Sequence, residues 1–105
     1  MYNLEIHKKA KETLDYLKKK NKDILLSIIN SLDEIIKKWF EVSNVKNIWD
    51  WIFRKRTWRY RILMTKDKKE LNKIHIWIIE LEKDTKKDYK KWKIHIIKNL
   101  SIIQN

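Results

Sequence analysis

All four arginines of the chain lie within the segment RKRTWRYR, residues 54–61. They are Arg54, Arg56, Arg59 and Arg61, and every other basic residue is a lysine or histidine. A guanidinium group binds a phosphate through two parallel hydrogen bonds and also stacks on bases, which a lysine ammonium group does not do. The cluster therefore indicates phosphate recognition, with a nucleic acid as the first candidate partner.

The overall charge supports the same interpretation. The chain has 26 Lys and Arg against 14 Asp and Glu, a net charge of +12, which attracts polyanions and speeds their encounter. Cysteine is absent, which excludes a disulfide, a thiolate nucleophile and a cysteine-based zinc site. Glycine is also absent, which excludes the glycine-rich loops that hold nucleotide phosphates.

The histidines do not form a metal-binding motif in the sequence. His7, His75 and His95 are single and stand at unrelated spacings, and no Ser-His-Asp order or carboxylate pair is evident. We therefore expect no metal site and no cofactor.

Two helices are predicted after a short N-terminal strand. Tyr2, Leu4 and Ile6 alternate with polar residues, which is typical of a strand with one buried face. Apolar residues then recur at helical spacing, first as Ala10, Leu14 and Leu17, and later as Leu25, Ile28, Ile29, Leu32, Ile35, Ile36 and Trp39. The run KKKNK separates these two helices.

The second half of the chain predicts strands and a last helix. Residues 49–65 indicate a hairpin with its turn at 55–58, and residues 74–81 indicate a central strand buried on both faces. A helix follows from Asp84 or Thr85, although the alternating KIHIIK leaves a strand open. We expect one α+β domain over residues 1–105, with helices on one side of a curved antiparallel sheet and residues 93–105 as a C-terminal extension.

Alternation along the hairpin sorts its side chains onto two faces. Tyr60, Ile62 and Met64 share the face that the helices would cover, whereas the arginines occupy the opposite, uncovered face. Like charges held together are tolerated most easily where an anion neutralises them. The alternative is a solvated edge whose charges discourage pairing between sheets.

The order of these motifs resembles the RelE/ParE superfamily of toxins from toxin–antitoxin pairs. The resemblance covers roughly residues 2–92. It rests on YNLEIHKKAKETLDYL, on the second amphipathic helix, on the hairpin ending in RYRILM, and on IHIWIIELEKDTKKDY. The glycine usually found before the Tyr-Arg pair is here Arg59, and the basic residue often found two positions before Arg54 is Ile52.

The resemblance implies a reaction and a set of residues. RelE members cut messenger RNA in the ribosomal A site without metal, through attack of the 2′-hydroxyl on the adjacent phosphate. By position, Arg61 would stabilise the phosphate, Arg54 and Arg56 would hold RNA and polarise the hydroxyl, Lys83 would be the general acid, and Tyr89 would orient the nucleotide. The other RNA-binding residues that we expect are Lys55, Trp58, Arg59, Lys86 and Lys87.

The expected partners are ribosome-bound mRNA and an acidic antitoxin protein. No apolar run approaches the roughly 20 residues of a membrane span, and the N-terminus lacks a signal peptide, so we expect a cytoplasmic protein without a membrane partner. Three alternatives remain: a ParE-like gyrase inhibitor, a non-catalytic nucleic-acid binder, and a module that binds an acidic peptide. The tail KIHIIKNLSIIQN is consistent with core, antitoxin contact or dimer contact.

Overall fold

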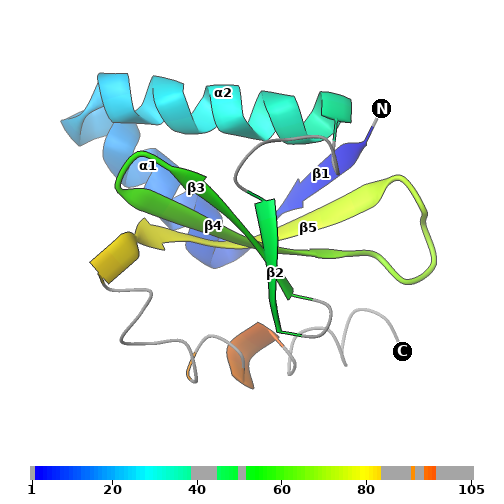
Figure 1. Ribbon diagram of the computed structural model, residues 1–105. Coiled ribbons are helices and arrows are strands. Elements are labelled where there is room, and N and C mark those ends of the chain that lie inside the picture. Colours follow the sequence, from blue (N-terminus) through cyan, green and yellow to red (C-terminus); the bar gives the residue numbers. More distant parts are fainter. Residues whose placement is uncertain (1, 39–44, 50–51, 84–90, 92–93, 97–105) are drawn as a thin grey trace.

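Two helices cover one face of a five-stranded sheet in the computed structural model of the chain (Figure 1). The structure describes residues 2–38, 45–49, 52–83, 91 and 94–96. The expected α+β architecture is confirmed. Of the predicted C-terminal helix, residue 91 and a helical turn at 94–96 are described, and the remainder lies outside the described residues.

The two predicted helices are present as α1, Lys8–Lys20, and α2, Lys22–Lys38. Each ends in lysines, and α2 carries Asp23 in its first turn, charges that complement the helix dipole. The side-chain oxygen of Asn21 accepts a hydrogen bond from the Ile24 amide at 3.2 Å and caps the start of α2. Neither helix is long and apolar enough to cross a bilayer.

Five strands form the sheet in the order β1-β5-β4-β3-β2. Their bounds are β1 Asn3–Ile6, β2 Val45–Trp49, β3 Ile52–Thr57, β4 Tyr60–Lys66 and β5 Lys73–Leu81. The apolar run of β5 is central as predicted. The separate strand β2 was not predicted, because the mixed segment EVSNVKN shows neither alternation nor an apolar run.

The prediction of a wholly antiparallel sheet is wrong for one pairing. β1 lies parallel to β5, with Glu5 opposite His75, whereas the other three pairings are antiparallel. A parallel pairing needs a long connection between the strands, and everything from α1 to β4 lies between β1 and β5. Strand periodicity carries no information about the partner or its direction, so the sequence did not reveal this pairing.

Each face of the sheet has its own apolar cluster. The helix-covered face holds the main core, whose fully buried members include Ala10, Leu17, Ile28, Ile35, Ile62, Met64, Ile74 and Ile76. The opposite face holds Ile52, Leu63, Trp77, Ile78 and Ile96. Because Ile96 belongs to the turn at 94–96, this second face is not bare, and the expectation of a fully uncovered face is wrong in that respect (Figure 1).

Candidate nucleic-acid interface

The β3–β4 hairpin turns at Trp58 and Arg59. Thr57 pairs with Tyr60, so only two residues form the loop, a tighter turn than the predicted 55–58. Trp58 has φ 53°, a left-handed conformation that glycine adopts without cost and other residues do not. The conformational demand that a glycine would meet therefore falls on Trp58, one residue before the position suggested by the resemblance.

Helix α2 holds β3 in place through two polar contacts. The Lys55 ammonium lies 3.2 Å from the Glu34 carboxylate, and the Thr57 hydroxyl is hydrogen-bonded to the Ser31 hydroxyl. Lys55 is only 2% exposed and points toward the helices. Alternation places Lys55 on the helix-covered face, opposite to the face that carries Arg54 and Arg56. The contact between Lys55 and RNA stays a prediction that this placement does not support.

Arg56 and Arg61 stand directly opposite each other in the hairpin and share one counterion. Glu82, just after β5, accepts from the Nη2 of both, at 2.7 Å for Arg61. Hydrogen bonds from Arg56 and then Arg61 lower the pKa of Glu82 to about 2, so this carboxylate is ionised at neutral pH. Without it, two like charges would face each other across the strands, an unfavourable arrangement. We call these three residues the Arg–Glu–Arg cluster.

Arg54 lies on the same face as the Arg–Glu–Arg cluster, opposite Leu63. Its Nε is buried and has no hydrogen-bond partner among the described residues. Arg54, Arg56 and Arg61 therefore share one face, as predicted. The expectation that these guanidinium groups stand free is wrong for both Arg56 and Arg61, because each is ion-paired with Glu82. The Arg61 side chain is 3% exposed, whereas the Arg56 side chain is 48% exposed.

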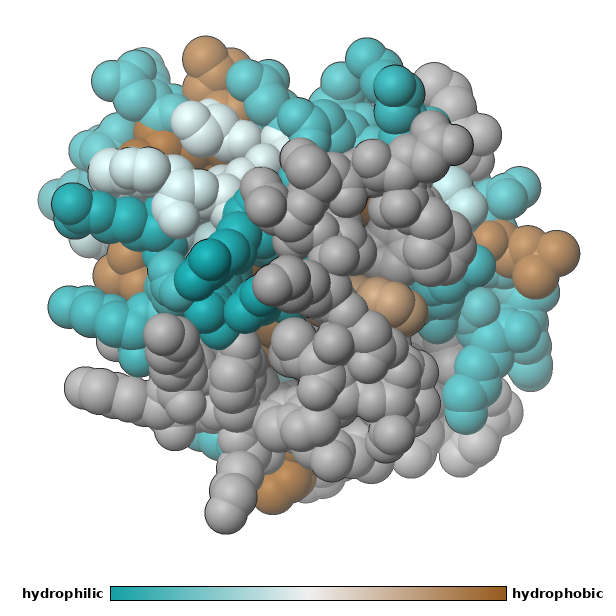
Figure 2. Space-filling view, viewed as in Figure 1, coloured by the Kyte–Doolittle hydropathy of each residue, from teal (hydrophilic) through white to brown (hydrophobic). Residues whose placement is uncertain are grey.

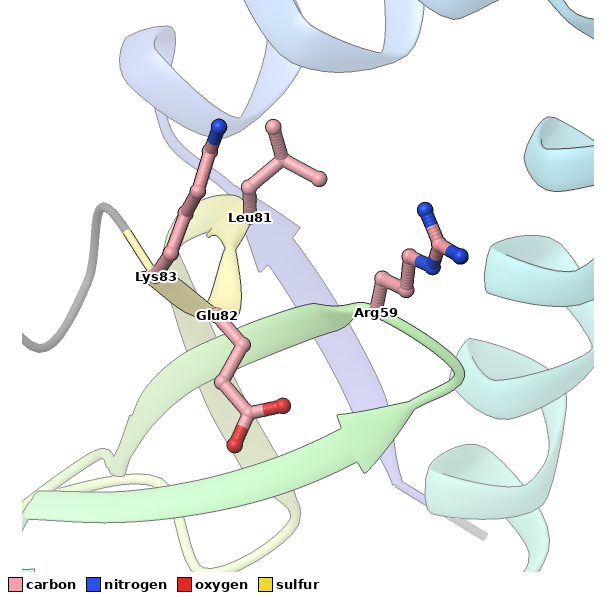
Figure 3. Close-up of a pocket in the computed structure, with 4 residues that line it drawn as sticks. All are labelled: Arg59, Leu81, Glu82 and Lys83. Atoms are coloured by element: carbon pink, nitrogen blue, oxygen red, sulfur yellow. The ribbon is translucent and has the colours of Figure 1, made fainter.

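Arg59 and Lys83 lie apart from the Arg–Glu–Arg cluster. Together with Leu81 and Glu82 they line a pocket of about 540 Å³, in which Arg59 and Lys83 point away from the Glu82 carboxylate (Figure 3). The backbone is nevertheless tied together here, because the Glu82 amide donates to the Arg59 carbonyl at 2.7 Å. The predicted grouping of Arg59 with Arg61 fails because Arg59 belongs to the turn rather than to β4.

Trp58 adds an aromatic surface at the tip of the hairpin. Its side chain is 64% exposed, and the guanidinium carbon of Arg59 lies 4.9 Å from its ring centroid. On the face drawn in Figure 2, the described side chains are mostly hydrophilic, and the hydrophobic ones lie apart from one another rather than in one broad patch. Tyr89, Lys86 and Lys87 lie outside the described residues, so their predicted roles stay predictions.

The fold is similar to that of solved YoeB structures. A chain of the YoeB–YefM complex from Staphylococcus aureus superimposes with a TM-score of 0.63 at 20% identity, covering 76% of this chain and 95% of that chain. The YoeB dimer from the same organism gives 0.59 at 18% identity, covering 75% and 94%. The chain has the YoeB fold. No protein-family model and no curated protein matches its sequence.

The fold shared with YoeB agrees with the α+β fold that the sequence resemblance implied. One of the similar structures is a heterotetrameric YoeB–YefM toxin–antitoxin complex from Staphylococcus aureus, at 19% identity and a TM-score of 0.63. Sequence reasoning missed Glu82, although this residue precedes Lys83 directly. Only the pairing of β4 with β5 brings it beside two arginines.

Proposed function

We propose that this protein is a RelE-like toxin that cleaves ribosome-bound mRNA without a metal ion. One observation carries the proposal: Arg56 and Arg61 stand opposite each other around an anion, beside Arg54, in the YoeB fold. A carboxylate and a phosphate oxygen make the same kind of charge-assisted hydrogen bond to arginine. The Arg–Glu–Arg cluster is therefore built to hold an anion, and a phosphate of RNA is our candidate.

The proposed reaction breaks one phosphodiester bond. The 2′-oxygen attacks the neighbouring phosphorus, its proton passes to a base, and the 5′-oxygen leaves with a proton from an acid. The products are a 2′,3′-cyclic phosphate and a 5′-hydroxyl. Arg61 and Arg56 would stabilise the extra negative charge on the phosphorane, with Arg54 holding the adjacent backbone.

Glu82 has two consequences for this reaction. Its charge holds both guanidinium groups in place before substrate arrives, which reduces the cost of ordering them. An incoming phosphate must also displace the carboxylate or share the arginines with it. We propose that Lys83 supplies the leaving-group proton after its side chain turns from the direction seen in Figure 3.

A cell-free translation reaction tests the proposal. Adding the protein should produce mRNA fragments with 5′-hydroxyl ends that depend on ribosomes, and Arg61→Ala should reduce cleavage about 100-fold or more, because removing one preorganised donor costs on that order. Lys68→Ala, which removes a positive charge from the β4–β5 turn, is the matched control and should cleave normally. Intact mRNA with the wild-type protein, or normal cleavage by a folded Arg61→Ala variant, would refute the proposal.

An acidic antitoxin partner and a cytoplasmic location belong to the same proposal. The net charge of +12 favours an acidic partner, and the similar structures include YoeB–YefM complexes. Co-expression with the product of a neighbouring small acidic gene should abolish mRNA cleavage and yield a stable complex on size-exclusion chromatography.

A second candidate function is a binder without catalysis, either a gyrase inhibitor or a nucleic-acid clamp. The burial of Arg61 in its pair with Glu82, and the direction of the Lys83 side chain away from the Glu82 carboxylate, favour this alternative. Inhibition of gyrase supercoiling together with intact mRNA would support a gyrase inhibitor. The nucleic-acid clamp would be supported if Lys83→Ala binds RNA as tightly as wild type and neither the variant nor the wild type cleaves it.

A further inference from the structure

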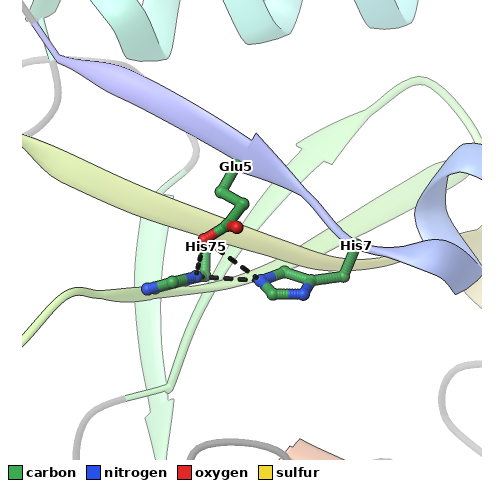
Figure 4. A group of neighbouring side chains, drawn as sticks. All are labelled: Glu5, His7 and His75. Atoms are coloured by element: carbon green, nitrogen blue, oxygen red, sulfur yellow. Dashed lines mark hydrogen bonds and ion pairs between the residues drawn. The ribbon is translucent and has the colours of Figure 1, made fainter. Parts of the chain in front are cut away.

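Two histidines and a glutamate meet where β1 lies against β5, away from the arginines. Glu5 on β1 pairs in register with His75 on β5, and His7 follows β1 by one residue. The three side chains converge on one point (Figure 4). His75 lies near the start of β5, whereas Glu82 of the Arg–Glu–Arg cluster follows its end, so these are separate sites.

The three ligand atoms have the spacing of a metal site. His7 Nε2 lies 2.8 Å from His75 Nδ1, Glu5 Oε2 lies 3.2 Å from His75 Nδ1, and Glu5 Oε2 lies 4.0 Å from His7 Nε2. Ligands of a tetrahedral Zn²⁺ at about 2.05 Å stand about 3.3 Å apart. The observed distances lie on both sides of that value, so small side-chain movements would admit an ion.

The surroundings of His75 are those of a metal-ligating histidine. Its other ring nitrogen, Nε2, lies 2.8 Å from Asp67 Oδ1, and Asp67 Oδ2 in turn accepts the backbone amides of Lys69 and Glu70 at 2.9 and 2.7 Å. A carboxylate that holds the second nitrogen of a ligating histidine fixes the ring and leaves the first nitrogen as a lone-pair donor. His75 is fully buried, so this orientation is enforced by packing.

His7 is also held in position and is available as a ligand. Its ring stacks on Trp77 with centroids 3.8 Å apart and an interplanar angle of 9°. It occupies the N-cap of α1 but makes no side-chain capping hydrogen bond.

The arrangement without an ion leaves acceptors facing each other. With Nε2 of His75 directed at Asp67 as a donor, Nδ1 presents a lone pair toward both His7 and the Glu5 carboxylate. One proton on His7 can satisfy His75, while the buried Glu5 Oε2 lies 3.2 Å from the Lys73 ammonium group. A cation at the centre would satisfy all three groups at once.

We propose that Glu5, His7 and His75 bind a divalent transition-metal ion, and that Zn²⁺ fits best. Two imidazoles and one carboxylate suit Zn²⁺, whereas Mg²⁺ and Ca²⁺ prefer sites made of oxygen ligands. Bound there, the ion would cross-link β1 to β5 and hold the start of α1. This site is independent of the proposed mRNA cleavage, which needs no metal, and it revises the expectation from the isolated histidine spacings.

Metal binding is tested on the full chain without a histidine tag. After treatment with a chelator, titration with ZnCl₂ should show one ion per chain, Co²⁺ should give the visible absorption of a four-coordinate complex, and Zn²⁺ should raise the Tm. Mg²⁺ should do none of these. His7→Gln and Glu5→Gln should each weaken Zn²⁺ binding at least tenfold, whereas His95→Gln should bind normally.

Lys73 supplies a test in the opposite direction. Its ammonium competes with the ion for Glu5, so Lys73→Ala should bind Zn²⁺ more tightly than wild type, with Lys68→Ala as the charge-matched control. Absence of binding by the wild-type chain at micromolar Zn²⁺ would overturn the proposal. Unchanged Zn²⁺ binding by His7→Gln would also overturn the proposal, because the ion would then be bound adventitiously elsewhere. If His7→Gln does not fold, unchanged Zn²⁺ binding by folded Glu5→Gln has the same meaning.

Discussion

The Arg–Glu–Arg cluster shows how one carboxylate determines the behaviour of two cations. Arg56 and Arg61 occupy opposite positions of an antiparallel pair, where like charges repel. Glu82 offsets this repulsion by forming an ion pair with each arginine. Hydrogen bonds from Arg56 and Arg61 lower the pKa of Glu82 to about 2. Its stabilising contribution is therefore present above the unfolded pKa near 4.5 and is lost as the pH falls toward 2.

We predict that Glu82→Gln lowers the Tm most at pH 7 and progressively less as the pH falls from 4.5 to 2. The physical reason is that wild type loses the same negative charge by protonation over that window, whereas the variant never has it. Thermal unfolding of both proteins at several pH values measures the difference. Glu12→Gln, at an exposed position of α1, is the control. A Tm difference that stays constant with pH would show that Glu82 does not titrate as described.

The hairpin turn is the element that orients the arginines. The register from Thr57–Tyr60 to Ile52–Thr65 places Arg54, Arg56 and Arg61 on one face, and a different loop length would move them. Only Trp58 among the described non-glycine residues has a positive φ. The left-handed conformation costs a residue with a Cβ about 1–2 kcal/mol.

We predict that Trp58→Gly is more stable than Trp58→Ala by about 1 kcal/mol. Both substitutions remove the exposed indole, so their difference isolates the backbone conformation at this position. Urea unfolding of the two variants gives the comparison directly. An alanine variant as stable as the glycine variant would mean that the turn relaxes out of the left-handed region.

The whole molecule attracts polyanions through its net charge of +12, and the lysines alone would do this. An experiment must therefore distinguish general attraction by the net charge from specific binding at the arginines of the hairpin. If Arg54, Arg56 and Arg61 each contact one RNA phosphate, log K against log salt should have a slope of about −2, since each contact to single-stranded RNA contributes about −0.7.

Arg56→Ala should accordingly flatten this salt slope by about 0.7, whereas Lys68→Ala should leave it unchanged. Fluorescence anisotropy with a short single-stranded RNA at several salt concentrations provides the slopes. Equal flattening by both substitutions would indicate a diffuse cationic surface without a defined arginine site.

Local patterns in the sequence were sufficient for much of the fold. Helical spacing identified α1 and α2, alternation identified the faces of β3 and β4, and the apolar run identified β5 as central. These signals are local because burial imposes a period of 3.6 on a helix and of 2 on a strand. β2 has no such pattern and was missed.

The sequence by itself determined which residue types were available for chemistry: four clustered arginines, no thiol and no glycine loop. Only the tertiary structure decided their neighbours. Glu82 forms ion pairs with Arg56 and Arg61, and Glu34 forms one with the buried Lys55. The parallel pairing of β1 with β5 brings Glu5 and His7 beside His75. Contacts between residues 20 to 70 positions apart depend on strand order and register. The interactions that select this order form between different elements, so they produce no periodic pattern in the sequence of a single strand or helix.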